Sequence, residues 1–241
     1  MMLHCASQSE KCFLDSDCRS LMLCPSQCGE SNQTCVFECF YSYENQISDN
    51  FMKCAITDHA CITLAPPKPP VICKRPTQVV KNFSLDMLEG SWYTVKGLNP
   101  MYDCYDCEIT RFAQNMSKSI VNAIEKFQVH TTKGTTVMRY VNETATVSDQ
   151  QDVSVLNYTS LQMGLYMITE RRILDVGENG EYLFMYYCGF ISNDYHTEGA
   201  AIFSKTPQLS SESWTRIQKV GSSFGFDMYK FCSPKPDNCI A

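Results

Sequence analysis

Cysteine constrains the possible folds of this chain more than any other residue type. The 241 residues include 15 Cys, and ten of them precede Lys74. A reducing cytosol rarely maintains so dense a disulfide framework, so the composition predicts an oxidising compartment.

The first part of the chain is the richest in Cys. Short intervals between them favour short helices cross-linked by disulfides, because residues three and four apart share one helical face. Too few large apolar residues are present for a conventional core, so disulfides would replace it. Zinc is the alternative, but only His4 and His59 lie nearby and this unit contains no Cys-x-x-Cys, so we expect no metal site. The nine residues are Cys5, Cys12, Cys18, Cys24, Cys28, Cys35, Cys39, Cys54 and Cys61.

Net charge and hydropathy limit which kinds of binding partner we expect. The net charge is −6 without a long basic run, so nucleic acid is not an expected partner. No apolar run approaches the roughly 20 residues that span a bilayer, so we expect no transmembrane segment. Five short sequons would also suit a secreted glycoprotein, and they lie at Asn32, Asn82, Asn115, Asn142 and Asn157.

Proline marks a boundary between two units. Five Pro fall between Leu64 and Pro76, and this density favours an extended, semi-rigid spacer. We therefore expect a disulfide-stapled helical domain over residues 1–63, a linker over 64–82 and a β domain over 83–241.

The β domain contains repeated short runs rich in Tyr, Val, Ile, Phe and Thr. Roughly eight strands at this spacing, with turn signals such as Lys133-Gly134, predict an up-and-down barrel. Trp214, Ile217 and Val220 recur at helical spacing and predict a helix against the barrel wall. The expected fold class is mainly β: an eight-stranded barrel with a C-terminal helix, preceded by the small helical domain. The runs cover residues 92–96, 107–112, 120–130, 136–147, 165–174, 182–188 and 200–204.

Two motifs connect the chain with a known family. Gly90-Ser91-Trp92 resembles the opening signature of a lipocalin barrel, in which the Trp plugs the closed end. The next motif, Gly97-Leu98-Asn99-Pro100, continues into Asp103, Asp106 and Cys107. Together with the Cys spacings of residues 5–61, it resembles the violaxanthin de-epoxidase family, which has a Cys-rich domain followed by a lipocalin domain.

The resemblance implies a disulfide pattern. It pairs Cys5 with Cys12, Cys24 with Cys39, Cys28 with Cys35 and Cys54 with Cys61, and it leaves Cys18 without its family partner. Cys107 matches a Cys that bridges to the C-terminal region, here Cys239 or Cys232. Pairing of Cys104 with Cys188 and of Cys73 with Cys232 would complete the set.

The resemblance also implies a ligand, a co-substrate and a compartment. These are a carotenoid epoxide in the barrel, ascorbate as reductant without a bound cofactor, and the thylakoid lumen. Opening an epoxide needs an acid at its oxygen, for which a carboxyl with a raised pKa and a Tyr hydroxyl are suited. As catalytic candidates we take Tyr187, Asp103 and Asp106, which match family positions, and Glu170 as a displaced carboxyl; as cavity residues we take Trp92, Tyr187, Phe203 and Met138.

Several site positions of the family differ in this chain. Its Asp-Asp-Trp-Tyr run aligns with Thr169-Glu170-Arg171-Arg172, so Arg171 replaces the Trp. Because the differences gather at the site and spare the scaffold, they indicate relaxed or lost catalysis. At the other positions that differ, Phe203 replaces a site Tyr of the family, Met138 and Glu108 each replace a site Gln, and Thr110 and Ala113 each replace a His.

Three functions remain as hypotheses at this point. We favour a lumenal family member with degraded catalysis that binds carotenoid or serves as a structural subunit beside photosystem or light-harvesting subunits. An active, ascorbate-dependent xanthophyll de-epoxidase is the alternative. A secreted, Cys-rich lipocalin that carries another hydrophobic ligand is the third, since one fold supports many functions.

Overall fold

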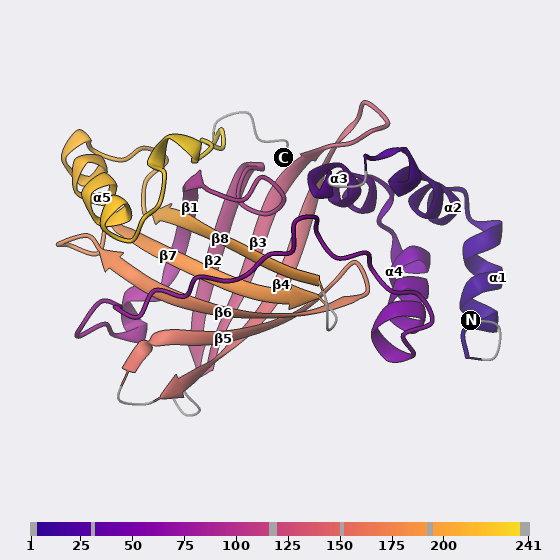
Figure 1. The fold of residues 1–241 in the computed structure, drawn as a ribbon, viewed down its shortest axis with the longest axis horizontal. Helices are drawn as coiled ribbons and strands as arrows, with labels where there is room; N and C mark the ends of the chain where they lie inside the picture. Colours follow the sequence, from indigo (N-terminus) through magenta and orange to yellow (C-terminus); the bar gives the residue numbers. More distant parts are fainter. Residues whose placement is uncertain (1–3, 30–31, 116–119, 150–151, 192–194, 237–241) are drawn as a thin grey trace.

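Eight antiparallel strands, connected in chain order, close into a barrel (Figure 1). The computed structural model describes residues 4–29, 32–115, 120–149, 152–191 and 195–236. Within these residues each strand pairs with its sequence neighbours, and β1 pairs with β8 to complete the ring. The strands are β1 (Gly90–Gly97), β2 (Asp106–Asn115), β3 (Ile120–His130), β4 (Thr136–Asp149), β5 (Asp152–Gln162), β6 (Leu165–Val176), β7 (Tyr182–Ile191) and β8 (Tyr195–Ser204).

The barrel predicted from the apolar runs is confirmed, and one strand, β5, lies outside all of those runs. Its inward side chains include the polar Ser160 and Gln162, so no apolar run distinguishes it. The turn that follows it, Met163-Gly164, has positive φ at both residues, 52° and 74°. It makes a tight hairpin without the Asn-Gly or Asp-Gly pair that usually signals one.

Trp92 fills the closed end of the barrel, as expected of the Gly-x-Trp motif. Its ring is fully buried in a cluster with Leu88 and Phe112. The indole nitrogen donates a hydrogen bond of 2.7 Å to the carbonyl of Leu88, at the end of the short helix η3 (Leu85–Leu88). The ammonium of Lys205 lies 3.9 Å from the ring centroid and covers the outer side.

The predicted C-terminal helix is also confirmed. α5 (Ser211–Ser223) packs outside the barrel through Ile217, in one apolar cluster with Phe184 of β7 and Ile202 of β8 (Figure 1). Arg216 of the same helix binds the buried Asp175 through two nitrogens, at 2.9 and 3.1 Å.

Among the described residues, the N-terminal unit contains four α-helices, of which α3 (Gln33–Tyr43) lies beside the open end of the barrel and α1 (Ala6–Leu14) lies farthest from it (Figure 1). Phe37 contacts the rings of Tyr102 and Tyr195, with centroids 5.4 and 6.1 Å apart, and Tyr41 contacts Phe127 at 5.2 Å. The core of the helical unit is therefore continuous with the barrel interior. The helices are α1 (Ala6–Leu14), α2 (Ser16–Leu23), α3 (Gln33–Tyr43) and α4 (Gln46–Met52), with the shorter turns η1 (Cys24–Gln27) and η2 (Lys53–Asp58).

The disulfides of this unit follow helix contacts. Cys24–Cys39 and Cys28–Cys35 form as predicted. The predicted pairs Cys5–Cys12 and Cys54–Cys61 are wrong, because the structure joins Cys5 to Cys54 and Cys12 to Cys18. α1 packs against α4, which brings the Cα atoms of Cys5 and Cys54 to 5.9 Å, and the corner between α1 and α2 brings those of Cys12 and Cys18 to 5.1 Å. Within the described residues, Cys61 keeps a free thiol.

The Pro-rich linker is bonded to the barrel along much of its length. Residues 64–82, all described, form neither helix nor strand and cross the outside of the barrel (Figure 1). A disulfide joins Cys73 to Cys188 of β7, and the Val80 N–H donates to the carbonyl of Ile173 in β6 at 2.9 Å. Arg172 donates to the carbonyl of Pro76 at 3.0 Å. These bonds hold the linker against the barrel wall.

The remaining disulfides differ from the conjectured ones. Cys104 pairs with Cys232, so neither Cys104–Cys188 nor Cys73–Cys232 forms. Cys188 points outward from β7, where the linker passes, whereas Cys232 forms a bridge with Gly97 beside the loop that carries Cys104. Cys107 is also disulfide-bonded, and its expected partner Cys239 lies outside the described residues.

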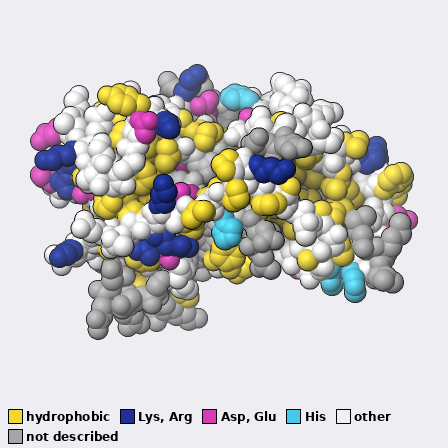
Figure 2. All heavy atoms as spheres, viewed as in Figure 1, with side chains coloured by type: hydrophobic (Ala, Val, Ile, Leu, Met, Phe, Trp, Pro, Cys, Tyr) yellow, Lys and Arg dark blue, Asp and Glu magenta, His cyan; other side chains and the backbone are white. Residues whose placement is uncertain are grey.

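Charged side chains of both signs are mixed on the face of the molecule that Figure 2 shows. Figure 2 shows Lys and Arg side chains interspersed with acidic and apolar ones on one face, rather than gathered in one patch. In the described part of the chain, no helix has the length and apolarity needed to cross a bilayer.

Candidate functional site

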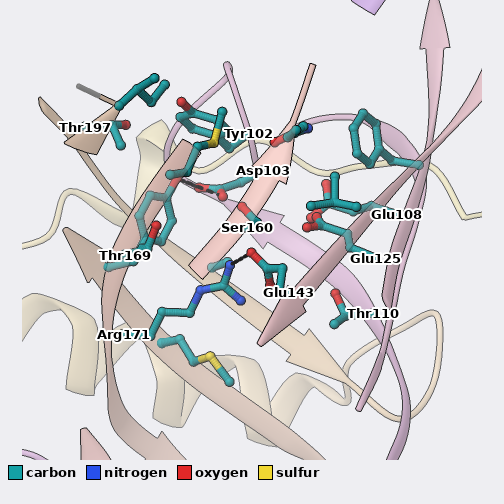
Figure 3. Close-up of a pocket in the computed structure, with 18 of the residues that line it drawn as sticks. Tyr102, Asp103, Glu108, Thr110, Glu125, Glu143, Ser160, Thr169, Arg171 and Thr197 are labelled. Atoms are coloured by element: carbon teal, nitrogen blue, oxygen red, sulfur yellow. Dashed lines mark hydrogen bonds and ion pairs between the residues drawn. The ribbon is translucent and has the colours of Figure 1, made fainter. Parts of the chain in front are cut away.

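A cavity occupies the barrel interior between the Trp92 end and the helical unit (Figure 3). Tyr41 of α3 contributes to its lining, so the helical unit forms part of its wall. Aromatic and thioether side chains alternate there with polar ones. The apolar members include Phe127, Met167, Met185 and Phe203, and the polar ones include Asp103, Glu108, Glu125, Glu143, Gln162, Arg171 and Tyr187.

Asp103 and Tyr187 form a buried pair at this cavity. The Tyr187 hydroxyl lies 2.9 Å from both carboxyl oxygens of Asp103 and donates to them. The backbone N–H of Asn99 donates to the same carboxyl at 3.0 Å. Burial raises the pKa of Asp103 to about 7, although these hydrogen bonds and the charge of Arg171 act in the opposite direction. The group can therefore gain or lose a proton near neutral pH.

The Gly-Leu-Asn-Pro motif builds the socket for Asp103. The Asn99 amide donates to the Thr197 hydroxyl at 3.0 Å and to the Glu198 carbonyl at 3.1 Å, which ties the loop to β8. A Cβ atom on Gly97 would lie 2.1 Å from the Cβ of Asp103. The motif thus requires Gly at its first position because the Asp103 backbone passes directly against it.

Three further carboxyls and one guanidinium enter the cavity from the strands (Figure 3). Arg171 donates to Glu143 at 2.5 Å and lies 4.0 Å from the ring centroid of Tyr158. Glu108 is 4% exposed, and burial together with the charge of Glu125 raises its pKa well above the ordinary value. Burial and the charge of Glu143 raise the pKa of Glu125 to about 7.

A β-bulge in β2 selects which acidic residue faces the cavity. Asp106 pairs with Gln128 and Ile109 with Lys126, so three steps along β2 match two along β3. Cys107, with φ of 58°, is the residue at this irregularity. The extra residue turns Glu108 inward and leaves Asp106 outside, where it accepts from the Lys235 N–H at 2.9 Å and lies 3.5 Å from His130.

The structure brings only part of the predicted site together. Asp103, Tyr187 and Phe203 line the cavity, whereas Asp106 does not. Trp92 lies in the closed-end core rather than at the cavity surface, and Met138 lies on the outward side of β4.

Glu170 also lies outside the cavity. Strand alternation turns Thr169 and Arg171 inward, while Glu170 accepts from Arg172 at 2.8 Å and from Arg75 at 3.2 Å on the outer face. A displaced carboxyl at position 170 therefore cannot reach a ligand in the barrel.

Glu125 and Glu143 are cavity residues that the sequence analysis missed. Each stands in an otherwise apolar inward series, Ala123-x-Glu125-x-Phe127 and Val141-x-Glu143-x-Ala145. A single acid on the apolar face of an alternating strand is the signal that could have identified both.

The Cys-rich unit supplies one group of potential metal ligands among the described residues. The sulfurs of Cys28, Cys35 and Cys39 lie within 4.8 Å of one another. All three belong to disulfides, and a disulfide sulfur lacks the thiolate charge that a metal site requires.

The closed barrel, the Trp plug and the packed C-terminal helix define a lipocalin. Insecticyanin from the tobacco hornworm Manduca sexta shares this fold, with a TM-score of 0.50 and 16% identity over 67% of this chain and 85% of that one. The family model described as the VDE lipocalin domain matches residues 1–238, and the chain belongs to this violaxanthin de-epoxidase (VDE) family.

Two relatives show how far the sequence of this chain has diverged within the family. The chloroplastic violaxanthin de-epoxidase of Arabidopsis thaliana is 24% identical over 96% of this chain, and that of Spinacia oleracea is 21% identical over 98%. The alignment covers 52% of each relative, so the chain spans about half the length of the curated relatives it matches.

Proposed function

We propose that the barrel binds an oxygenated carotenoid, a xanthophyll, with one end ring at the Tyr187–Asp103 pair. The buried hydroxyl–carboxyl pair carries this proposal, because it is a polar anchor beside apolar walls that include Phe127, Met185 and Phe203. That combination suits a long apolar ligand with an oxygen at its end. Membership of a family whose relatives are named violaxanthin de-epoxidases supports the same ligand class.

Within this function we favour a non-catalytic role, as a pigment holder or a subunit of a photosynthetic membrane complex in the thylakoid lumen. β6 presents Thr169 and Arg171 to the cavity, and the guanidinium of Arg171 is already bound to Glu143. This strand therefore offers a bound ligand no acid, which favours a non-catalytic role. An exposed apolar surface on α1 and α2 supports a protein partner: Phe13 and Leu14 are each 74% exposed and Leu23 is 65% exposed.

Ascorbate-dependent de-epoxidation is the second candidate, and the state of Asp103 favours it. With a pKa of about 7, Asp103 carries a proton at acidic pH beside the Tyr187 hydroxyl. Such a pair can protonate an epoxide oxygen while ascorbate supplies two electrons, which yields an alkene, water and dehydroascorbate. Turnover of violaxanthin with ascorbate would establish this role over the non-catalytic one.

A substitution that fills the cavity tests the binding site. Ser160→Phe places a ring inside the barrel, whereas Leu161→Phe, the next residue of β5, places one on the outer face, where Leu161 is 50% exposed. Violaxanthin added to the wild-type protein should acquire visible circular dichroism that saturates at an equimolar ratio. We expect Ser160→Phe to abolish this signal and Leu161→Phe to retain it. Equal binding by both variants would place the ligand elsewhere.

A further inference from the structure

Four Cys of the N-terminal unit occur in two pairs with the same spacing. Three residues separate Cys24 from Cys28, and three separate Cys35 from Cys39. Residues four apart lie on one face of a helical turn, so each pair presents two sulfurs in one direction. A separation of roughly two to four residues between Cys ligands is typical of structural zinc sites. The spacing therefore suits a metal ion as well as the two disulfides of the oxidised protein.

The fold brings both pairs together between η1 and α3. Cys24 begins η1 and Cys28 follows its last residue, while Cys35 and Cys39 lie on α3, which packs against η1. The disulfides join the two elements crosswise, Cys24 to Cys39 and Cys28 to Cys35. The sulfurs of Cys28, Cys35 and Cys39 lie within 4.8 Å of one another, and the sulfur of Cys24 is bonded to that of Cys39. All four sulfurs are thus gathered in one place.

The distances between these sulfurs fit a tetrahedral zinc ion. A Zn–S bond of about 2.3 Å places the thiolates of a four-coordinate site roughly 3.8 Å apart. The sulfurs of Cys28 and Cys39, which belong to different disulfides, already lie 3.9 Å apart. Once the S–S bonds are opened, rotation of the side chains can move each bonded pair of sulfurs apart to the same distance. The backbone of η1 and α3 therefore already has the arrangement that a zinc site requires.

The surroundings favour thiolates and allow access to them. Cys35 lies in the first turn of α3, where the Asn32 side chain caps the helix by accepting from the Cys35 N–H at 3.1 Å. The positive end of a helix stabilises a thiolate in this position. Cys24, Cys28 and Cys35 are half-buried, so a reductant and a metal ion can reach them, whereas Cys39 is fully buried. Elsewhere in the described part of the chain, no three His, Cys, Asp or Glu residues bring their ligand atoms so close together.

We propose that the Cys quartet, defined as Cys24, Cys28, Cys35 and Cys39, binds one Zn²⁺ through four thiolates when it is reduced. Two molecules of a dithiol reduce the two S–S bonds: each dithiol becomes a disulfide, and the protein gains four electrons and four protons as four thiols. Zinc then displaces the four thiol protons and forms four Zn–S bonds. Oxidation of the quartet by a disulfide reverses these steps and releases the metal. None of the four Cys lines the barrel cavity, so the zinc site is independent of xanthophyll binding.

The zinc site would preserve the closure of the barrel, because α3 carries both. Phe37 and Tyr41 of this helix contact Tyr102 and Phe127 of the barrel domain. A structural zinc site stabilises the fold of a small unit directly, as its disulfides do. With the disulfides open, zinc keeps η1 joined to α3 and keeps α3 in place at the barrel. The unit can therefore form in an oxidising compartment with two disulfides and in a reducing one with zinc.

Alkylation of the reduced protein tests the site. The protein is reduced with a phosphine, which opens disulfides without adding a competing thiol, and is then treated with iodoacetamide with or without one equivalent of Zn²⁺. We expect zinc to abolish alkylation of the Cys quartet and to leave Cys12 and Cys18 equally modified, as read by peptide mass spectrometry. Co²⁺ in place of zinc should give the visible absorption of a tetrahedral tetrathiolate at one ion per chain. The dissociation constant for zinc should be on the order of 10 nM or lower.

Two double variants separate the quartet from the other thiols. Cys28→Ser with Cys35→Ser removes one disulfide and two ligands, and it should lose the Co²⁺ absorption. Cys12→Ser with Cys18→Ser is the matched control, since it removes a disulfide of the same unit but no ligand, and it should keep the absorption. Treatment of the zinc-loaded wild-type protein with an oxidised dithiol should release one zinc ion for every two disulfides formed.

Three outcomes would overturn the proposal. The first is a reduced wild-type protein in which zinc protects no Cys from alkylation. The second is protection of Cys outside the quartet in its place, because the metal would then bind elsewhere. The third is equal Co²⁺ absorption in the two double variants, because the four sulfurs would then not be the ligands. The alkylation result is read on the wild-type chain and so does not depend on whether either variant folds.

Discussion

At the scale of single residues, two glycines make the Asp103–Tyr187 contact possible. Gly97 leaves room for the backbone of Asp103, and Gly199 of β8 leaves room for the phenol of Tyr187. The motif around Gly97 was visible in the sequence and led to Asp103. Gly199 gave no such signal, because its role depends on the pairing of β7 with β8, where Tyr187 lies opposite it.

Gly199→Ala tests this arrangement. Its Cβ would lie 2.3 Å from the Tyr187 hydroxyl oxygen, so the ring must move away from Asp103. We expect a loss of roughly 1–3 kcal/mol in the free energy of unfolding, from the broken buried hydrogen bond, and weaker violaxanthin binding. Gly29→Ala is the matched control, since nothing lies within 4 Å of its Cβ. Wild-type stability and binding in Gly199→Ala would show that the contact is dispensable.

At the scale of elements, the sequence predicted helices and strands better than their contacts. The periodicity of β3 or of α5 is local and was readable, but the pairing of Cys5 with Cys54 depends on α1 lying against α4. In the same way, the bulge at Cys107 decides that Glu108 rather than Asp106 faces the cavity. The spacing of Asp103 and Asp106 in the motif does not reveal a shift in the register between β2 and β3. The sequence therefore predicted only some of the acidic residues that line the cavity.

The helix α3 closes the open end of the barrel through Tyr41. Its hydroxyl accepts from the Gln162 amide at 2.6 Å, and its backbone carbonyl accepts from Arg139 at 2.9 Å. The phenol ring packs on Phe127 inside the barrel. Tyr41 is the α3 side chain that lines the cavity at this end.

Tyr41→Ala should therefore open the cavity. We expect faster dissociation of violaxanthin, measured by transfer to lipid vesicles, and a loss of about 3 kcal/mol in the free energy of unfolding, because a buried ring is removed. Tyr41→Phe keeps the ring and should leave the dissociation rate close to that of the wild type. Unchanged dissociation in Tyr41→Ala would mean that the ligand uses another route.

At the scale of the whole molecule, buried acids link stability to pH. The pKa of Asp103, Glu125 and Glu44 rises to about 7 in each case, mainly through burial, and burial also raises the pKa of Glu108 well above its ordinary value. Unfolded carboxyls titrate near pH 4. Between these values the folded protein binds more protons than the unfolded one, so its stability decreases as the pH rises.

Thermal unfolding should follow this sign. We expect the highest Tm at mildly acidic pH and a decrease of several degrees as the pH rises from about 4 to about 7, since each pKa unit corresponds to about 1.4 kcal/mol. Glu125→Gln removes one titrating group and should flatten the dependence, whereas Glu178→Gln, exposed on the surface, should not. A Tm that rises from about pH 4 to about pH 7 would contradict the raised pKa of these acids.

Trp92 lies in the closed-end core next to the cavity, so its fluorescence should report whether a xanthophyll occupies the barrel. The chain has two Trp, so Trp214→Phe leaves Trp92 as the single Trp, whose emission can be excited selectively over that of the Tyr residues. Violaxanthin should quench its emission in a saturable, equimolar titration, and Ser160→Phe in the same background should abolish the quenching. Violaxanthin that binds without quenching Trp92, or that quenches it equally in the Ser160→Phe variant, would show that the xanthophyll does not occupy the barrel.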